Sequence, residues 1–192
     1  MTPRSSRTTA RAAALSARYS ERMTTFVLTV VGDDRSGLVA AVADVVGDHG
    51  GNWENSQLAE LSGAFAGIIE VSVAAERADE LRAALTALEG LLKVTVHPGA
   101  DEPPKIPARA LTLQVIGNDH PGIVREISAV LRNHDVSIDH LTTRTAEAAM
   151  YGGRLFEATV VARVPASVDL DALTGELERL ATEIQVDVTL AP

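Results

Sequence analysis

The sequence predicts an α+β fold of two tandem β-α-β-β-α-β units, each with a four-stranded antiparallel sheet. Two observations carry this prediction: an internal repeat, and the same order of strand-like and helix-like periods in each copy. Phe26–His49 aligns with Leu111–His134 at an offset of 85 residues. Because the similarity runs through a strand, a loop and a helix in order, it predicts two copies of one structural unit. The identical pairs include Gly32/Gly117, Asp34/Asp119, Gly37/Gly122, Val39/Val124, Val45/Val130 and His49/His134.

The elements of the first copy follow from hydrophobic period. Apolar runs and weak alternation predict strands at Phe26–Val31, Asn52–Leu61, Phe65–Ala74 and Leu91–Val96. Apolar residues at helical spacing predict helices over Gly37–Asp48 and Asp79–Leu88. Gly50-Gly51 predicts the end of the first helix, and Ser62-Gly63 predicts a turn between the two middle strands.

The second copy has the same predicted order. Its strands are expected near Leu111–Ile116, Val136–Thr145, Leu155–Val164 and Gln185–Leu190. Its helices are expected near Pro121–Asn133 and Asp169–Ala181. Ala146–Arg154 predicts a longer hairpin loop than in the first copy, with Gly152-Gly153 as its turn.

The segments outside the repeats set the expected domain boundaries. Pro98–Pro107 holds four of the eight prolines, which excludes regular helix or sheet and predicts an extended connection. Residues 1–22 carry five Arg and one Glu, a composition compatible with a transit peptide, a nucleic-acid-binding arm or a disordered extension ahead of Met23. We favour the disordered extension. The boundaries are 1–22 for this extension, 23–98 for the first unit, 99–108 for the linker and 109–192 for the second unit.

Composition and charge exclude several classes of function. The chain has no cysteine, which removes thiolate catalysis, disulfides and Cys-ligated metals and fits a reducing cytoplasm. No apolar run reaches the length of about 18 residues that a membrane helix needs. The net charge of −9 becomes −13 over residues 23–192, which disfavours direct nucleic-acid binding. No nucleophile elbow, zinc-protease motif, P-loop or dinucleotide fingerprint occurs, so we expect no enzyme activity and no cofactor.

The loop after the first strand of each unit resembles a known signature. Gly32–Val39 reads Gly-Asp-Asp-Arg-Ser-Gly-Leu-Val, and Gly117–Val124 reads Gly-Asn-Asp-His-Pro-Gly-Ile-Val. Both loops resemble the strand-to-helix signature of ACT domains, and Gly50–Ser56 resembles the start of that family's second strand. The resemblance covers roughly residues 24–190 and implies ferredoxin-like units that sense amino acids. Two such units with little else most resemble the glycine cleavage system transcriptional repressor group.

The chemistry of an amino-acid ligand suggests how these loops would bind it. A helix N-terminus offers free N–H groups and partial positive charge to a carboxylate. Gly37 and Gly122 allow close backbone approach, and Pro121 suits a first helical turn. Asp34 and Asp119 are candidate acceptors for the ammonium group, with helix capping or an Asx turn as the alternative role. The predicted ligand-binding residues are Asp34, Ser36, Gly37, Leu38, Asn52, Asn55, Asp119, His120, Pro121, Gly122 and Ile123.

Other residues have structural explanations that compete with a role in binding. His120 is expected to be a solvent-exposed loop residue that touches ligand only as the less favoured alternative. His49 and His134 end equivalent helices, where an imidazole suits the negative C-terminus better than it suits a metal site. Trp53 is expected in the core or an interface. Ser36 and Ser137 depart from the family's usual Pro and Asn, so one site built from Asp119–Ile123 and Asn52 is the preferred hypothesis.

These observations predict a cytoplasmic regulatory protein that binds a small amino acid of the glycine or serine class. It would control a protein partner, such as a transcription factor in amino-acid or one-carbon metabolism. Two alternatives remain: a regulatory subunit of an amino-acid metabolic enzyme, and a direct nucleic-acid binder that uses residues 1–22. Exposed sheet edges make a homodimer compatible with the fold.

Overall fold

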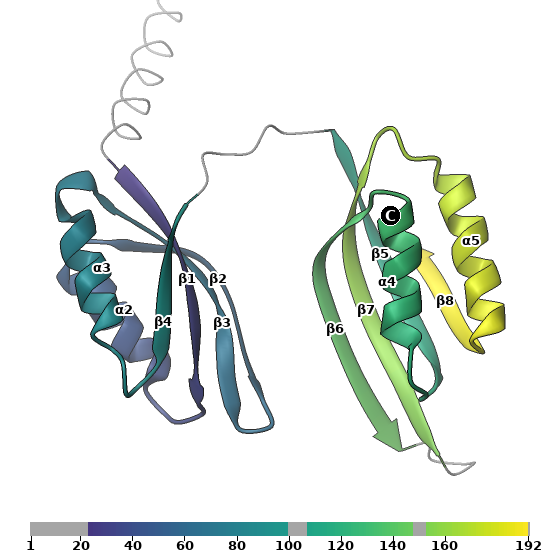
Figure 1. The fold of residues 1–192 in the computed structure, drawn as a ribbon, viewed down its shortest axis with the longest axis horizontal. Coiled ribbons are helices and arrows are strands. Elements are labelled where there is room, and N and C mark those ends of the chain that lie inside the picture. Colours follow the sequence, from purple (N-terminus) through teal and green to yellow (C-terminus); the bar gives the residue numbers. More distant parts are fainter. Residues whose placement is uncertain (1–22, 100–106, 148–152, 192) are drawn as a thin grey trace, which may run out of the picture. The chain divides into compact units, whose positions relative to one another are not determined.

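The chain divides into two compact units, with the division between Pro103 and Pro104. The computed structural model describes residues 23–99, 107–147 and 153–191 (Figure 1). The predicted extension 1–22, most of the predicted linker and Gly152 of the predicted hairpin turn lie outside these residues.

Unit one is a four-stranded antiparallel sheet with two helices. Its strands are β1 (Met23–Asp33), β2 (Asn52–Leu61), β3 (Ala64–Ala74) and β4 (Lys93–Pro98). They lie in the order β2-β3-β1-β4, so β2 and β4 form the edges. The helices are α2 (Leu38–Asp48) and α3 (Ala78–Thr86), and a short 3₁₀ turn η1 (Ala75–Arg77) precedes α3.

The core of unit one lies between the sheet and its helices. Strand alternation sends every second side chain of β1 and β3 to one face, where α2 and α3 cover it (Figure 1). The helices contribute apolar residues at a spacing of three or four, which forms the matching stripe. The fully buried side chains include Phe26, Leu28, Val42, Ile69, Val71, Leu81 and Leu85.

Unit two repeats this architecture. Its strands are β5 (Ala108–Asn118), β6 (Ser137–Glu147), β7 (Arg154–Pro165) and β8 (Val186–Ala191). The sheet order β6-β7-β5-β8 matches that of unit one, and α4 (Ile123–Asn133) and α5 (Leu170–Glu183) cover one face (Figure 1). The predicted fold class, two tandem ferredoxin-like units with antiparallel sheets, is therefore confirmed.

The strands extend beyond the apolar runs that predicted them. β1 pairs with β3 from Met23 to Asp33, although its apolar run covers only Phe26–Val31. The ladder continues because backbone hydrogen bonds do not require apolar side chains. In the same way β6 continues through Glu147, which shortens the loop predicted at Ala146–Arg154.

The first helix of each unit ends in the same hydrogen-bonded motif. After α2, Gly50 has a φ of 67°, its N–H donates to Gly47, and the next N–H donates to Val46. This is a Schellman motif, in which a left-handed residue closes the helix. Asp135 takes the same conformation after α4 with a φ of 56°. The glycine ending predicted for α2 is therefore correct, and unit two achieves the same turn with aspartate.

Candidate functional site

The loop between the first strand and first helix of each unit is organised by a left-handed glycine. Gly37 has φ 93° and ψ −1°, and Gly122 has φ 111° and ψ −17°. Residues with a Cβ are strained at such positive φ values, so the turn needs glycine. Each glycine is the N-cap of its helix, and neither helix start receives a side-chain cap.

These caps leave the first backbone donors of both helices without a helical acceptor. The first helical bonds run from Ala41 N–H to Gly37 O at 2.9 Å and from Glu126 N–H to Gly122 O at 3.0 Å. The N–H groups before them have no acceptor inside the helix. A Cβ placed on Gly37 would meet no atom within 4 Å. The bend in unit one is therefore open, and its donors lie where an anionic group gains from the helix dipole.

The bend in unit two differs because an acidic side chain lies over it. Glu126 Oε1 would be 3.1 Å from a Cβ placed on Gly122, and Arg125 pairs with this carboxylate at 3.0 Å. The first turn of α2 has no acidic residue, and Ala41 stands at the position equivalent to Glu126. A carboxylate thus lies in the first turn of the second helix, whereas the first turn of α2 has none.

The two loop aspartates are exposed and do not cap the helices. Backbone N–H groups of Asp34 and Asp119 donate to Gly63 O and Arg154 O, each at 2.8 Å. These bonds fix each loop to the start of its unit's third strand. The Asp119 carboxylate lies 3.8 Å from Arg154 Nε. The side-chain capping alternative is therefore wrong, and the Asp119 carboxylate is paired with Arg154 instead.

Two predicted site residues have side chains that are inaccessible to ligand. Leu38 and Ile123 are each only 2% exposed, since they anchor the first turn of their helices in the core. Only their backbone N–H groups can contribute. Ser36 and Pro121 are exposed beside them.

His120 is not the solvent-exposed loop residue that the sequence suggested. Its ring is part-buried, with Nε2 2.9 Å from Ile184 O and Nδ1 3.2 Å from Pro121 O. The backbone bond to Ile184, and then that to Pro121, raises the pKa of His120 above its usual value. At the equivalent position in unit one, Arg35 Nη2 donates to Gly90 O and Leu91 O, each at 2.9 Å.

The predicted asparagines lie at the other end of the sheet in unit one. Asn52 pairs with Ser72, which pairs with Thr25 near the start of β1. From Thr25 to Asp34 the strand spans roughly 30 Å at about 3.3 Å per residue. Asn52 and the loop at Gly37 therefore do not form one site within unit one.

The side chains of both asparagines contact carboxylates. Bonds from Ser72, and then from the Asn52 side chain, hold the pKa of Glu54 below its usual value. Asn55 Nδ2 donates to Glu70 Oε2 at 2.7 Å. Asn55 and Glu70 line an open hollow on the uncovered face of the sheet, together with Thr25, Val27, Ser56, Gln57, Ile68, Ile69 and Gly99.

A second hollow lies in unit two near its loop. The C-terminal end of β5 forms one side of this hollow, and the α5–β8 turn forms the other. Its polar lining comes from Asn118, Glu178, Thr182, Gln185 and Asp187. Asn118 directly precedes the loop at Asp119, so this hollow borders the predicted site without including it.

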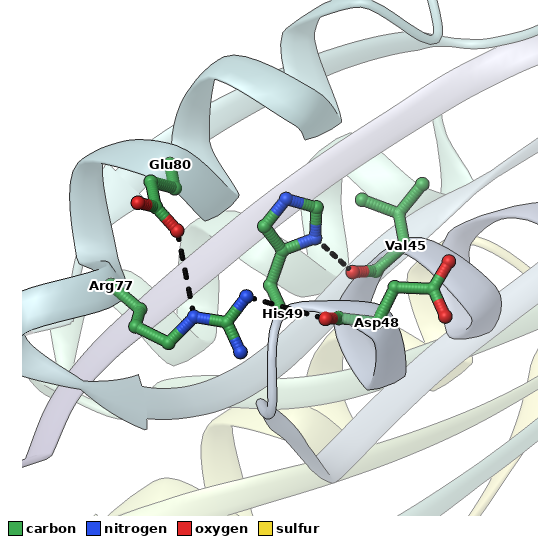
Figure 2. A network of polar contacts seen from close by, with 5 residues as sticks. All are labelled: Val45, Asp48, His49, Arg77 and Glu80. Carbon is green, nitrogen blue, oxygen red and sulfur yellow. Dashed lines mark hydrogen bonds and ion pairs between the residues drawn. The ribbon is translucent and has the colours of Figure 1, made fainter.

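The helix-ending histidines have structural roles. His49 Nδ1 lies 2.8 Å from Val45 O at the end of α2 (Figure 2). At the same helix end, Arg77 Nη2, from the residue before α3, donates to Asp48 O at 3.3 Å. His134 Nε2 contacts Glu176 Oε2 of α5 at 2.8 Å. Within residues 23–99, 107–147 and 153–191, no group of three or more potential ligands could hold a metal ion. Trp53 packs partly buried against the core of unit one.

Three contacts of the loops and the hollow were missed from the sequence. Arg35 bonds the first loop to the α3–β4 turn, Arg154 pairs with Asp119, and Glu70 binds Asn55. The repeat alignment could have indicated the Arg35 contact, because Arg35 and His120 are polar residues at equivalent positions of the two loops. The other two contacts depend on strand register, which the sequence did not reveal.

Among the residues that the structure describes, no helix is long and apolar enough to cross a membrane.

Comparisons with known proteins agree with the fold and the loops. ACT domain family models match residues 24–98 and residues 111–182. The glycine cleavage system transcriptional repressors of Escherichia coli (strain K12) and Shigella flexneri are each 30% identical over 162 residues, covering 82% of this chain and 84% of each relative. A crystal structure of an unknown protein from Galdieria sulphuraria superposes with a TM-score of 0.79 at 28% identity, covering 88% of this chain and 97% of that one. A structure provisionally described as a glycine cleavage system transcriptional repressor has a TM-score of 0.65 at 20% identity, covering 88% and 96%, and supports the fold.

Proposed function

The chain belongs to the ACT-domain family and is a regulatory protein related to the glycine cleavage system transcriptional repressor, and from this membership we propose that it senses a small amino acid. The ligand class is glycine or serine. Ligand binding changes the affinity for a protein partner that acts in the transcriptional control of amino-acid or one-carbon metabolism. The observation that carries the proposal is the pair of uncapped helix starts behind Gly37 and Gly122.

The proposed chemistry assigns one group to each charge of the zwitterion. The ligand carboxylate accepts from the N–H groups of the first helical turn, where the helix dipole favours an anion. The ammonium group donates to an exposed loop carboxylate, Asp34 or Asp119. The side-chain amides of Asn52 and Asn55 form a separate proposed contact, because they lie at the far end of the unit-one sheet from the Gly37 loop. The openness at Gly37 favours the loop of unit one for the carboxylate.

We propose a protein rather than a nucleic acid as the partner. Residues 23–192 carry a net charge of −13, and phosphate backbones are attracted to basic surfaces. The relatives of known name are transcriptional repressors, which supports a regulatory role without catalysis and a cytoplasmic location. Linkage requires the ligand to bind the free and partner-bound states with different affinity. A homodimer through exposed sheet edges is part of the proposal and is measurable by sedimentation velocity.

Isothermal calorimetry with glycine, serine and leucine tests the ligand class. We expect glycine or serine to bind, and Asp34→Asn to weaken that binding about tenfold, because it removes the carboxylate proposed to accept from the ammonium group. Asp44→Asn is the matched control, because Asp44 is an exposed aspartate of α2 outside the loop. If none of the three amino acids binds a folded protein, the sensing proposal is wrong.

Crosslinking in the native cell, followed by mass spectrometry with and without the ligand amino acid, distinguishes the partner classes. A ligand-dependent crosslink to a transcription factor supports the main proposal. A ligand-dependent crosslink to an amino-acid metabolic enzyme instead establishes the alternative, a regulatory subunit.

A further inference from the structure

A polar side chain ties each candidate loop to the turn before the last strand of its unit. Arg35 bonds to the carbonyl groups of Gly90 and Leu91, and His120 bonds to the carbonyl group of Ile184, all at 2.9 Å. Positions 35 and 120 are equivalent in the repeat. The same tether therefore joins the same two parts of each unit, but with a different side chain.

The tether and a backbone bond hold each loop from two sides. The backbone bonds from Asp34 to Gly63 and from Asp119 to Arg154 fix each loop to the hairpin side of its sheet. The side-chain tether fixes it to the opposite side, at the α–β turn. The left-handed glycine follows within two residues, so the tether lies close in sequence to the first helical N–H groups.

The geometry around His120 suits a protonated ring. Both ring nitrogens face carbonyl oxygens, Ile184 O at 2.9 Å and Pro121 O at 3.2 Å. Only the imidazolium form can donate from both nitrogens, whereas the neutral ring presents a lone pair to one of these oxygens. An arginine remains charged and keeps all its donors at any physiological pH.

Charged residues occur on the loop, α4, β7, the end of α5 and the start of β8, which are the segments that adjoin the two ends of the tether. They are Asp119, Glu126, Arg125, Arg154, Glu183 and Asp187. The carboxylates of Glu126 and Asp119 favour the protonated ring, in addition to the larger influence of the two backbone bonds that raise its pKa. Arg125 and Arg154 pair with these same carboxylates and moderate their effect.

We propose that Arg35 and His120 are positioning residues for the two candidate ligand loops, and that rising pH weakens the tether of unit two, by removing one of the two hydrogen bonds of His120, while that of unit one persists. A histidine whose pKa is raised by folding stabilises the native contact below its ordinary value of about 6.5. That stabilisation is lost as pH rises through the folded-state value. The effect on ligand affinity rests on the proposed sensing function, whereas the tether itself does not.

NMR titration of the full chain without ligand tests the tether directly. Between about pH 5.5 and about pH 8.5, we expect the His120 ring and the amides of residues 119, 120, 122 and 123 to titrate together, above the free-histidine value of about 6.5. The amides of residues 34–38 should not follow that titration. His120→Arg should abolish it in unit two, and Arg35→His should introduce one in unit one. A His120 titration at or below the free value, or an unchanged amide titration in His120→Arg, would overturn the proposal.

Calorimetry with glycine and serine at about pH 6 and about pH 8 measures the consequence for binding. We expect wild-type affinity to fall about fivefold at the higher pH, and His120→Arg to remove most of that fall. If His120 and the loop amides titrate together but neither amino acid binds, the proposed sensing function is wrong and the proposed tether is still supported. Binding with equal pH dependence in wild type and His120→Arg would reject His120 as a positioning residue.

Discussion

Glu126 and Ala41 occupy equivalent positions and give the two helix starts different charge. Glu126 places a carboxylate beside the bend at Gly122, whereas Ala41 leaves the bend at Gly37 open. An anion near a helix N-terminus gains about 0.3–1 kcal/mol. The Glu126 carboxylate therefore takes part of the stabilisation that a ligand carboxylate would otherwise gain in unit two.

Glu126→Gln should strengthen amino-acid binding at unit two by about twofold to threefold, because it removes a competing negative charge. Isothermal calorimetry with glycine or serine at low salt measures the change. Glu76→Gln is the control, since Glu76 is an exposed carboxylate in η1 of unit one. Equal affinities for wild type and Glu126→Gln would show that this carboxylate does not compete with ligand.

Gly37→Ala should destabilise unit one by about 1–2 kcal/mol, because its φ of 93° strains a residue with a Cβ. Gly47→Ala is the matched comparison within the same helix. Gly47 lies inside α2 without a positive φ, and a Cβ there meets no atom within 4 Å. Gly47→Ala should stabilise unit one by up to about 1 kcal/mol, because alanine has a higher helix propensity than glycine. Urea unfolding measures both, and destabilisation by both variants would contradict this account of the bend.

Helix ends and strand ends show how far the elements were predictable. The order of the elements followed from the spacing of apolar residues and from the internal repeat. Gly50 correctly marked the end of α2. Asp135 was not recognised as the equivalent turn residue, because aspartate is not specific for the left-handed conformation. η1 was also missed, since a single 3₁₀ turn has no apolar period. Strand ends such as Met23 and Glu147 are set by backbone pairing rather than by side-chain pattern.

Asp135→Gly should stabilise unit two by about 0.5–1 kcal/mol, because glycine adopts the φ of 56° without a Cβ penalty. The reciprocal change, Gly50→Asp, should destabilise unit one by a similar amount. Thermal and urea unfolding of both variants measure the effects. A less stable Asp135→Gly protein would show that the aspartate contributes more through other contacts than it costs in backbone strain.

The two sheets of the molecule differ on the faces that their helices leave uncovered. In unit one this face carries the exposed apolar residues Val31, Leu61 and Ile68. In unit two the ion pair Arg144–Glu157 occupies the place of two alanines in unit one, with nitrogen–oxygen distances of 2.6 and 2.7 Å. The repeated fold therefore carries two surfaces of different chemistry.

The candidate site was only partly predictable at the scale of the whole chain. Two loops with uncapped helix starts followed from the repeated signature at Gly37 and Gly122. The position of Asn52 at the far end of its sheet did not, because strand register depends on long-range pairing. The joint site of Asn52 with Asp119–Ile123 stays a prediction, as do the domain boundaries at 22, 98 and 108.

Titration of ¹⁵N-labelled protein with glycine and serine, followed by amide NMR, tests the sensing account most directly. The amides of Leu38, Val39 and Ala40, or those that follow Gly122, should shift in a saturable manner, because their N–H groups donate hydrogen bonds to the ligand carboxylate. Saturable shifts confined to residues away from both helix starts, or no shift in a folded protein, would contradict the account.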